Sequence, residues 1–421
     1  MGKGKVFYSW WIVAGAAIIL VVMGSASVAV ANLYQAPVTA EFGISNSQFA
    51  ISNSLVLGVG IFLSPFISQK FATGNFNRIY AISVLVYALA YIGYAFTSNI
   101  YVFYLLSLLV GYGYMSTTFI PTTMLINKWF VKKRGLALSL ALTGLGIGGV
   151  VFSQLVTTLI ENVGWRMTYV VYGLIMLAVV LPIVLFVYKV NPEDMQLKAY
   201  GTAADDLGQA RERNEDDEGE MQQVQAVRMS VSESMKKPFF VLLVAGSVLV
   251  GITNNGGLGQ FPPVLTELHG ATVAAMIISV YSAVGIVGKL ILGNLNDRFG
   301  IIVSILYSCI LLALSYVLMM FAGNLAVAFV SAVLFGLGNA IGTVLPPLMT
   351  SSVYSAEQYP KVYGYVQSGV QLGMTVGSLF AAGIADLTGS YNVSWIAIAA
   401  LSVVVAFAWG GSYRNARAYI A

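Results

Sequence analysis

The sequence contains few charged residues and almost no cysteine or histidine. Charged residues make up 9% of the 421 residues, whereas about 25% is usual in soluble domains, so a cytosolic enzyme is excluded. Cys309 and His269 are the single cysteine and the single histidine, which leaves no disulfide framework, no cysteine metal site and no histidine-paired catalytic triad. We therefore expect no catalytic residue, no metal, no cofactor and no enzymatic activity.

The sequence consists mostly of long apolar runs. Hydrophobic residues make up 58% of the chain, and a helix needs about 20 mostly apolar residues to cross the hydrocarbon core of a bilayer. The runs fall at residues 10–35, 46–69, 78–97, 100–126, 136–161, 165–189, 238–266, 271–295, 300–322, 324–351, 361–386 and 390–412. They are too long and too continuously apolar for the strands of a membrane barrel. The sequence therefore predicts an all-α integral membrane protein with twelve transmembrane helices.

One polar segment interrupts the apolar chain. Residues 191–237 hold nearly half of the charged residues, including the acidic run Asn214–Glu220. Such a composition is typical of a disordered or partly helical linker. Six apolar runs precede the segment and six follow it. We therefore predict two pseudo-symmetric six-helix bundles, residues 1–190 and 238–421, joined by a cytoplasmic linker at residues 191–237.

Basic residues indicate how the chain is oriented. If both termini lie in the cytoplasm, the short inner loops carry most of the lysine and arginine, whereas the outer loops carry only Arg166. This distribution follows the positive-inside rule. It predicts a multi-pass protein of the cytoplasmic (inner) membrane, with anionic membrane lipids as partners of the basic cluster around Lys132 and Lys133. The net charge of +4 then reflects topology, and no nucleic-acid partner is expected.

The loop after the eighth run carries a family signature. It consists of Gly293-Asn-Leu-Asn-Asp297-Arg298-Phe-Gly and resembles the loop signature of the major facilitator superfamily. A glycine permits close approach of helices, and an aspartate can cap a helix or pair with arginine. The resemblance implies the fold of that superfamily, with Gly293, Asp297 and Arg298 as gating residues on the cytoplasmic side. The matching position after the second run holds Gln69 in place of an acid, so we expect a weaker latch there.

A second resemblance narrows the family. The run Asn127-Lys-Trp-Phe-Val-Lys-Lys-Arg134-Gly-Leu-Ala is followed by Gly144, Gly146, Gly148 and Gly149. It is similar to the junction between the fourth and fifth helices of the monocarboxylate transporters and the oxalate/formate antiporters. The opening Tyr8-Ser-Trp-Trp and the pair Tyr363-Gly364 are similar as well. The resemblance implies transport of small organic anions, and we add Arg134 to the gating residues. The small residues of the fifth run should let helices pack closely.

Lys289 is the one ionisable residue that lies in the middle of a predicted helix. Such a charge is costly in a bilayer and by default marks a functional site. Tyr281, Gly285, Lys289 and Gly293 follow one another at intervals of four, so they share one helix face. The alternative is that the lysine stem snorkels toward the inner surface. The family resemblance implies a pocket, because Lys289 stands where these transporters carry an arginine that binds the substrate carboxylate.

A single buried cation also limits the charge of the substrate. A dianion would leave one negative charge uncompensated in a medium of low dielectric constant, which is costly. The oxalate/formate antiporters carry a second cation in the eleventh helix, where this chain has Gln367-Ser-Gly-Val-Gln371. We therefore favour monocarboxylates such as lactate and pyruvate. Lysine lacks the two-pronged hydrogen bonding of arginine, so selection among carboxylates is expected to be looser.

Other polar and aromatic residues are expected to line the same cavity. The run Asn254–Gly257 predicts an unwound segment in the seventh helix, which is tolerated at membrane depth only where it is buried or in contact with water. Hydrogen bonding between helices is the alternative role for each residue. Besides Lys289, the predicted substrate-binding residues are Tyr34, Tyr112, Phe119, Asn254, Asn255, Gln260, Tyr281, Asn339, Thr343, Gln367 and Gln371.

These features predict a monomeric secondary transporter that rocks two bundles around a central anion site. The glycines of the fifth run lack the lysine of a phosphate loop, so gradients should drive transport. Two couplings are open: Lys289 releases its proton in the empty site, so that H+ and anion move together, or it stays charged and anions must exchange. The alternatives are an antiporter of oxalate, formate or other dicarboxylates, an exporter of bulkier amphipathic organic acids or drugs, and a non-transporting membrane sensor.

Overall fold

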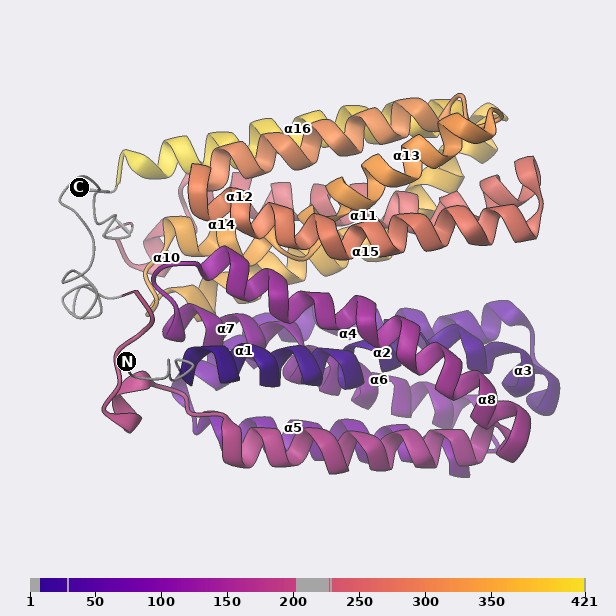
Figure 1. Ribbon diagram of the computed structural model, residues 1–421, viewed down its shortest axis with the longest axis horizontal. Coiled ribbons are helices and arrows are strands. Elements are labelled where there is room, and N and C mark those ends of the chain that lie inside the picture. Colours follow the sequence, from indigo (N-terminus) through magenta and orange to yellow (C-terminus); the bar gives the residue numbers. More distant parts are fainter. Residues whose placement is uncertain (1–7, 29, 202–226, 228, 420–421) are drawn as a thin grey trace, which may run out of the picture. The chain divides into compact units, whose positions relative to one another are not determined.

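The computed structural model describes residues 8–28, 30–201, 227 and 229–419. The regular structure of these residues is helical, apart from one isolated bridge between Phe130 and Tyr200. The chain divides into two compact units, Met1–Gln223 and Val224–Ala421 (Figure 1). The division falls inside the predicted linker, whose acidic run Asn214–Glu220 lies outside the described residues.

The first unit consists of helices joined by short turns. Its α-helices are α1 (Tyr8–Ile19), α2 (Ser25–Val28), α3 (Gln35–Phe42), α4 (Asn46–Thr73), α5 (Phe76–Gly93), α6 (Ile100–Thr117), α7 (Phe119–Trp129) and α8 (Arg134–Pro182). Short π-helical turns lie at η1 (Leu20–Gly24) and η4 (Ile183–Val187). Short 3-10 turns lie at η2 (Ala31–Tyr34), η3 (Tyr94–Phe96) and η5 (Pro192–Met195).

The second unit repeats this plan with fewer interruptions. Its α-helices are α10 (Val231–Ser234), α11 (Pro238–His269), α12 (Ala271–Met319), α13 (Leu325–Gly338), α14 (Leu345–Val353), α15 (Tyr359–Thr388) and α16 (Tyr391–Arg417). A 3-10 turn, η6 (Asn339–Gly342), separates α13 from α14.

Ten helices among the described residues are long and apolar enough to cross a membrane. Two of them are too long for one crossing, because α8 and α12 contain 49 residues each, about 73 Å at 1.5 Å per residue, against a hydrocarbon core of about 30 Å. Each turns at a glycine with non-helical torsions, Gly164 (φ 80°, ψ 162°) and Gly300 (φ 79°, ψ 179°), and a positive φ suits glycine. Each unit therefore has six spans, and the predicted all-α membrane fold is confirmed.

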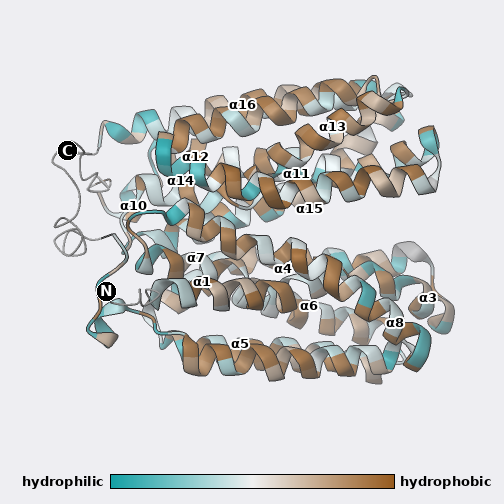
Figure 2. Ribbon diagram, in the orientation of Figure 1, coloured by the Kyte–Doolittle hydropathy of each residue, from teal (hydrophilic) through white to brown (hydrophobic). Residues whose placement is uncertain are grey.

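Hydrophobic residues occupy these helices along most of their length, and hydrophilic residues gather near the helix ends (Figure 2). Large apolar side chains such as Phe62, Phe66 and Phe407 are at least 70% exposed. In water such exposure would be unfavourable, whereas lipid tails are as apolar as the side chains themselves. The helices therefore present apolar residues outward as well as to one another.

Close helix crossings repeat in the two units. In the first unit, Gly144 and Gly148 of α8 lie against the backbone of α1 and η1, where a Cβ atom would clash. In the second unit, Gly369, Gly373 and Gly377 of α15 lie against the backbone of α11 in the same way. A spacing of four residues places such glycines on one helix face, and the missing side chains let the backbones approach. The close packing expected of the fifth run is therefore found at Gly144 and Gly148, and it recurs in the eleventh span.

The seventh span is not unwound, so that prediction is wrong. The helix α11 continues from Pro238 to His269 through the run Asn254–Gly257. Asparagine and glycine form helices poorly in water, but lipid offers no hydrogen-bond partners to free backbone groups and therefore favours a continuous helix. Gly257 in this run allows close packing instead, because a Cβ atom there would meet the ring of Phe335 and the hydroxyl of Tyr316.

The described ends of the predicted linker are attached to their own units. The N–H of Tyr200 donates to Trp129 O at 2.8 Å, and Tyr200 O accepts from the N–H of Val131 at 2.9 Å. In the second unit, the N–H of Val227 donates to Val353 O at 3.1 Å. Trp129 and Val353 are the last residues of α7 and α14, so both linker ends contact the end of the fourth span of their own unit.

Candidate substrate site

The fourth span of each unit is broken at a corresponding position. In the first unit, α6 and α7 are separated by Thr118, which has φ −105° and ψ −97°. In the second unit, α13 and α14 are separated by the 3-10 turn η6. Corresponding interruptions in two repeated halves of a membrane protein are the best pointer to its binding site. These two breaks, rather than the seventh span, are therefore the candidate location of the substrate site.

Asn254 of α11 is bound to the break in the second unit. Its Nδ2 donates to Asn339 O at 3.0 Å and also to Asn339 Oδ1. A backbone carbonyl can only accept, so it determines the orientation of the Asn254 amide. Gly342 leaves room for this side chain, because a Cβ atom there would lie 2.5 Å from Asn254 Nδ2. Two predicted ligands are thus brought together, next to the half-buried Thr343, but the Asn254 donor is used within the protein.

Lys289 lies on the side of α12 opposite to two exposed apolar residues. These residues, Val287 and Ile291, are 52% and 40% exposed. Successive helical residues are rotated by about 100°, so Lys289, two residues from each of them, is on the opposite side, where it is half-buried. A Cβ atom on the preceding Gly288 would lie 2.9 Å from Gly336 O. This turn of α12 therefore packs on α13 just before the break.

Two predicted amide ligands of the second unit are engaged with neighbouring helices. Asn255 Nδ2 donates to Met374 O at 2.5 Å. Gln260 Nε2 donates to Ser378 Oγ at 2.8 Å, and Gln260 Oε1 accepts from Tyr391 Oη at 2.9 Å. These bonds join α11 to α15 and α16, which is the interhelical role that the sequence left open.

The remaining predicted residues of the second unit are buried. Gln367 Oε1 accepts from the hydroxyl of Tyr363 at 3.1 Å, and Gln371 lies one turn further along α15, also buried. Tyr281 of α12 packs edge-on against Phe335 of α13, with ring centroids 5.4 Å apart. Tyr281 therefore lies on the same side of α12 as Lys289, facing the helix that contains the break.

Tyr34 lies in a cluster of buried tyrosines. The first candidate span ends at Val28, earlier than the predicted residue 35, and Tyr34 follows it in η2. Its ring stacks on Tyr169 with centroids 3.9 Å apart, and Tyr91 lies edge-on at 6.4 Å. The hydroxyl of Tyr34 is buried without a hydrogen-bond partner among the described atoms. Tyr34 thus belongs to the core of the first unit.

Tyr112 and Phe119 lie on either side of the break in the first unit. Tyr112 is half-buried, and its hydroxyl is 3.4 Å from Ser83 Oγ. Phe119 begins α7 and packs edge-on against Tyr114 at 6.1 Å. Both predicted residues are therefore close in sequence to the break at Thr118. Tyr34, in η2, lies far from that break in the sequence.

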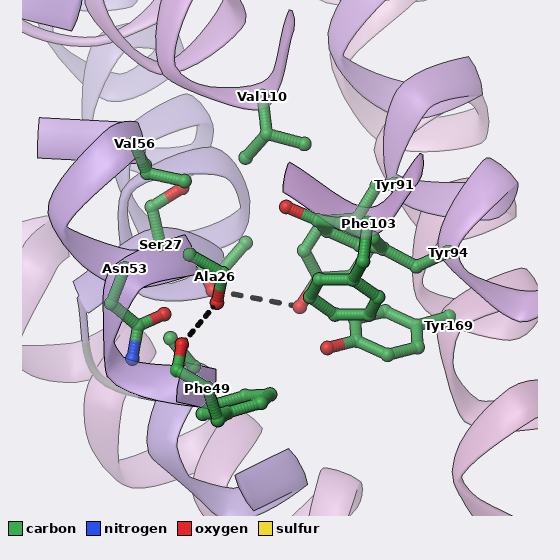
Figure 3. Close-up of a pocket in the computed structure, with 12 residues that line it drawn as sticks. Ala26, Ser27, Phe49, Asn53, Val56, Tyr91, Tyr94, Phe103, Val110 and Tyr169 are labelled. Carbon is green, nitrogen blue, oxygen red and sulfur yellow. Dashed lines mark hydrogen bonds between the residues drawn. The ribbon is translucent and has the colours of Figure 1, made fainter. Parts of the chain in front are cut away.

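A small cavity in the first unit was not predicted. Figure 3 shows Tyr91, Tyr94 and Tyr169 on one side of it and Ser27 and Asn53 on the other. Its volume is about 20 Å³, enough for about one water molecule and too small for an organic anion. Tyrosines recur at helical spacing along α5, and this repeat was the signal in the sequence for the cluster.

The predicted gating residues lie near helix ends. Asp297 and Arg298 are exposed and come just before the turn within α12, and Gly293 is buried one turn earlier. Arg134 begins α8, and its Nε donates to Phe130 O at 3.1 Å. Arg134 therefore holds the loop that precedes its own helix.

Two repeated six-span units, each with a broken fourth helix, define an integral membrane protein with the architecture of the secondary transporters. No group of three histidine, cysteine, aspartate or glutamate residues that could hold a metal ion occurs in the described part of the chain. The chain belongs to the Major Facilitator Superfamily, because the model of that family matches residues 14–262 and 243–415. The predicted superfamily is therefore confirmed, and the protein is a multi-pass membrane transporter of this family.

Known relatives and solved structures agree with this family. The chain is 26% identical over 358 residues to "Uncharacterized MFS-type transporter YhjX" of Escherichia coli K12. The aligned region covers 81% of this chain and 80% of that protein. It is 28% identical over 138 residues to monocarboxylate transporter 14 of Homo sapiens, 32% of this chain and 27% of that one. The solved structure of the proton:xylose symporter XylE aligns with a TM-score of 0.73 at 13% identity and covers 95% of this chain and 94% of that one, which shows a shared fold.

Proposed function

We propose that this transporter carries small monocarboxylate anions, of the size of lactate and pyruvate, across the cytoplasmic membrane by alternating access. The observation that carries the proposal is the place of Lys289, which is half-buried, opposite the exposed Val287 and Ile291, and one residue from the contact of α12 with α13. A cation at membrane depth is costly unless it serves a function. The similarity to monocarboxylate transporter 14 supports the same substrate class over the 138 residues that it covers.

In this proposal the ammonium group of Lys289 binds the carboxylate as a point charge. The positive charge of Lys289 attracts the anion, and the donors of Asn254, Asn255 and Gln260 bond to neighbouring helices. Aromatic groups such as Tyr281 limit the size of the substrate. Gly293, Asp297, Arg298 and Arg134 help to close the cytoplasmic side.

The proposal leaves two ways of coupling, which vesicles can separate. If Lys289 loses its proton when the site is empty, a pH gradient alone drives uptake into vesicles that contain no substrate. If Lys289 stays charged, uptake requires an anion on the other side. Uptake into empty vesicles under a pH gradient would therefore contradict strict exchange.

Lys289→Ala tests the anion site directly. A charge-assisted hydrogen bond is worth about 1.5–3 kcal/mol, and 1.4 kcal/mol is a factor of ten. We therefore expect Lys289→Ala to lower Vmax/KM for labelled lactate or pyruvate in vesicles at least about tenfold, whereas Lys289→Arg retains transport. Lys198→Ala, which removes an exposed lysine outside the spans, is the matched control.

The variants are compared at equal expression, and the parent protein is also assayed with a panel of substrates. Undiminished transport by Lys289→Ala would contradict the proposed site. Preference for oxalate over lactate, pyruvate and acetate would favour the dicarboxylate antiporter. Preference for a bulky amphipathic acid would favour an exporter of such compounds.

A further inference from the structure

Each broken fourth span has a backbone carbonyl that lacks its usual helical donor. In the first unit, Thr117 is followed four residues later by Pro121, and proline has no N–H to donate. In the second unit, the N–H of Thr343, four positions after Asn339, donates to Ala340 O at 3.2 Å instead. Asn339 O therefore loses its α-helical donor and keeps only the less well aligned donor of the 3-10 turn η6, three positions on. A carbonyl that loses its α-helical donor is costly at membrane depth, because lipid offers no substitute.

A buried side chain from another helix donates to this carbonyl in both units. Tyr80 of α5 donates its hydroxyl to Thr117 O at 2.6 Å. Asn254 of α11 donates its amide to Asn339 O at 3.0 Å. Tyr80 is fully buried, and Asn254 is 4% exposed. Both donors therefore reach a break from within the protein, where water does not compete for the carbonyl.

The two donors are not copies of one another. Tyr80 lies in the third span of the first unit and is a tyrosine, whereas Asn254 lies in the first span of the second unit and is an asparagine. Sequence repetition between the halves therefore does not explain why each break receives a side-chain donor. The shared requirement is physical, namely a bent fourth helix with a carbonyl that has lost its α-helical donor.

We propose that Tyr80 and Asn254 are positioning residues that hold the two fourth spans in their bent form during the transport cycle. Each acts through a carbonyl at the break, and neither has to touch the substrate. For Asn254 this role replaces the substrate contact expected from the sequence. The kinetic part of the proposal rests on the proposed transport function, whereas the structural part does not.

Loss of either donor should make the backbone around the corresponding break more mobile. A typical hydrogen bond is worth roughly a factor of 2 to 10 in an equilibrium constant. We expect Tyr80→Phe to speed hydrogen exchange about three- to tenfold at residues 115–124, and Asn254→Ala to do the same at residues 337–348. Vmax should fall by a similar factor while KM stays within about twofold, because binding is left intact and the bent conformation is less populated.

The experiment is hydrogen exchange by mass spectrometry on the full chain in lipid nanodiscs, paired with uptake in vesicles. Tyr94→Phe removes the same hydroxyl from a buried tyrosine whose partner is Ser107 Oγ, at 2.9 Å. Asn255→Ala removes the same amide one residue along α11, where the partner is the carbonyl of Met374. These controls should leave exchange at both breaks unchanged.

Each outcome decides the proposal. Unchanged exchange at the breaks in Tyr80→Phe and Asn254→Ala would overturn it, and so would faster exchange with an unaltered Vmax. A higher KM with an unaltered Vmax in Asn254→Ala would restore substrate contact as the role of that residue. If the parent protein transports none of the carboxylates, the proposed substrate class fails, and the exchange comparison still decides whether these donors hold the breaks.

Discussion

At the scale of single residues, Arg166 joins three separate parts of the first unit. Its Nη2 forms an ion pair with Glu41 Oε1 of α3 at 2.8 Å. Its Nη1 donates to Ala95 O at 2.5 Å and Thr97 O at 2.7 Å, at the end of the third span. The sequence identified Arg166 as the single basic residue of the outer loops, but its partners lie about 70 or more positions away and could not be deduced.

The contact between Arg166 and Glu41 predicts a pH-dependent stability. Hydrogen bonds from Arg166, and to a lesser extent from Trp165 at 2.6 Å, hold the pKa of Glu41 below its ordinary value of 4.5. A carboxylate whose pKa is lowered by folding stabilises the protein above the ordinary pKa, and this contribution is lost as the pH falls through the lowered pKa. Glu41 is 45% exposed, so solvent screening limits the effect to about 0.2–1 kcal/mol.

Thermal unfolding of the parent and of Glu41→Gln in detergent, between about pH 7 and pH 3, checks this prediction. The parent should melt at the higher temperature near pH 7, and the two melting temperatures should converge at the acid end. Glu161→Gln removes an exposed acid from α8 and should behave like the parent throughout. A difference between parent and Glu41→Gln that persists undiminished at pH 3 would refute the assignment.

At the scale of helices, neither helix propensity nor proline alone locates the breaks. The weak helix formers of Asn254–Gly257 stay helical, because lipid offers no hydrogen-bond partners to free backbone groups. Pro262 and Pro263 lie further along the same continuous helix. The fourth span of the first unit breaks just before Pro121, and in the second unit Pro346 and Pro347 follow the break. Proline removes a donor, but Pro65 also lies inside the continuous helix α4, so a proline by itself does not determine where a span breaks.

The glycine crossings make a second prediction at this scale. Gly373→Ala should lower the free energy of unfolding by about 1–3 kcal/mol, because its Cβ atom would press on the backbone of α11 and the two helices would have to separate. Gly383→Ala in the same helix is the control, because no described atom lies within 4 Å of its Cβ position. Thermal unfolding of both variants measures the difference. Equal melting temperatures for the two would contradict the close crossing.

At the scale of the whole molecule, each unit keeps its own core and its own end of the linker. Residue 200 pairs with the end of α7, and residue 227 pairs with the end of α14. The boundary between the compact units lies between these two anchors. The described ends of the predicted linker, residues 191–237, therefore contact the units that they join.

Cysteine labelling tests the predicted orientation of the chain. Cys309 is the single cysteine, so Cys309→Ser provides a background without thiols. The positive-inside rule places residue 323 outside and residue 198 in the cytoplasm. A maleimide that cannot cross membranes should label Gly323→Cys in intact cells and should reach Lys198→Cys only after the cells are opened. The reverse pattern would contradict the assignment of both termini to the cytoplasm.

Much less of the candidate site than of the fold could be predicted from the sequence. Lys289 was identifiable because a single charge in an apolar run is conspicuous, and Asn254 and Asn339 were both selected as polar residues within spans. Their mutual hydrogen bond was not predictable, because it joins residues 85 positions apart. The role of Tyr80 could not be predicted, because nothing in its local sequence distinguishes it from the other tyrosines of α5.

The sequence by itself determined that this protein lies in lipid, that it crosses the membrane in two sets of six spans, and that it carries one cation, Lys289, in the middle of a span. These properties add up along the chain, since burial in lipid depends on the hydropathy of each run of about 20 residues. Only the tertiary structure decided which carbonyls lose their helical donors, which side chains replace them, and which face of α12 carries Lys289. Those choices depend on how distant segments pack, and no local property of a segment specifies its partner.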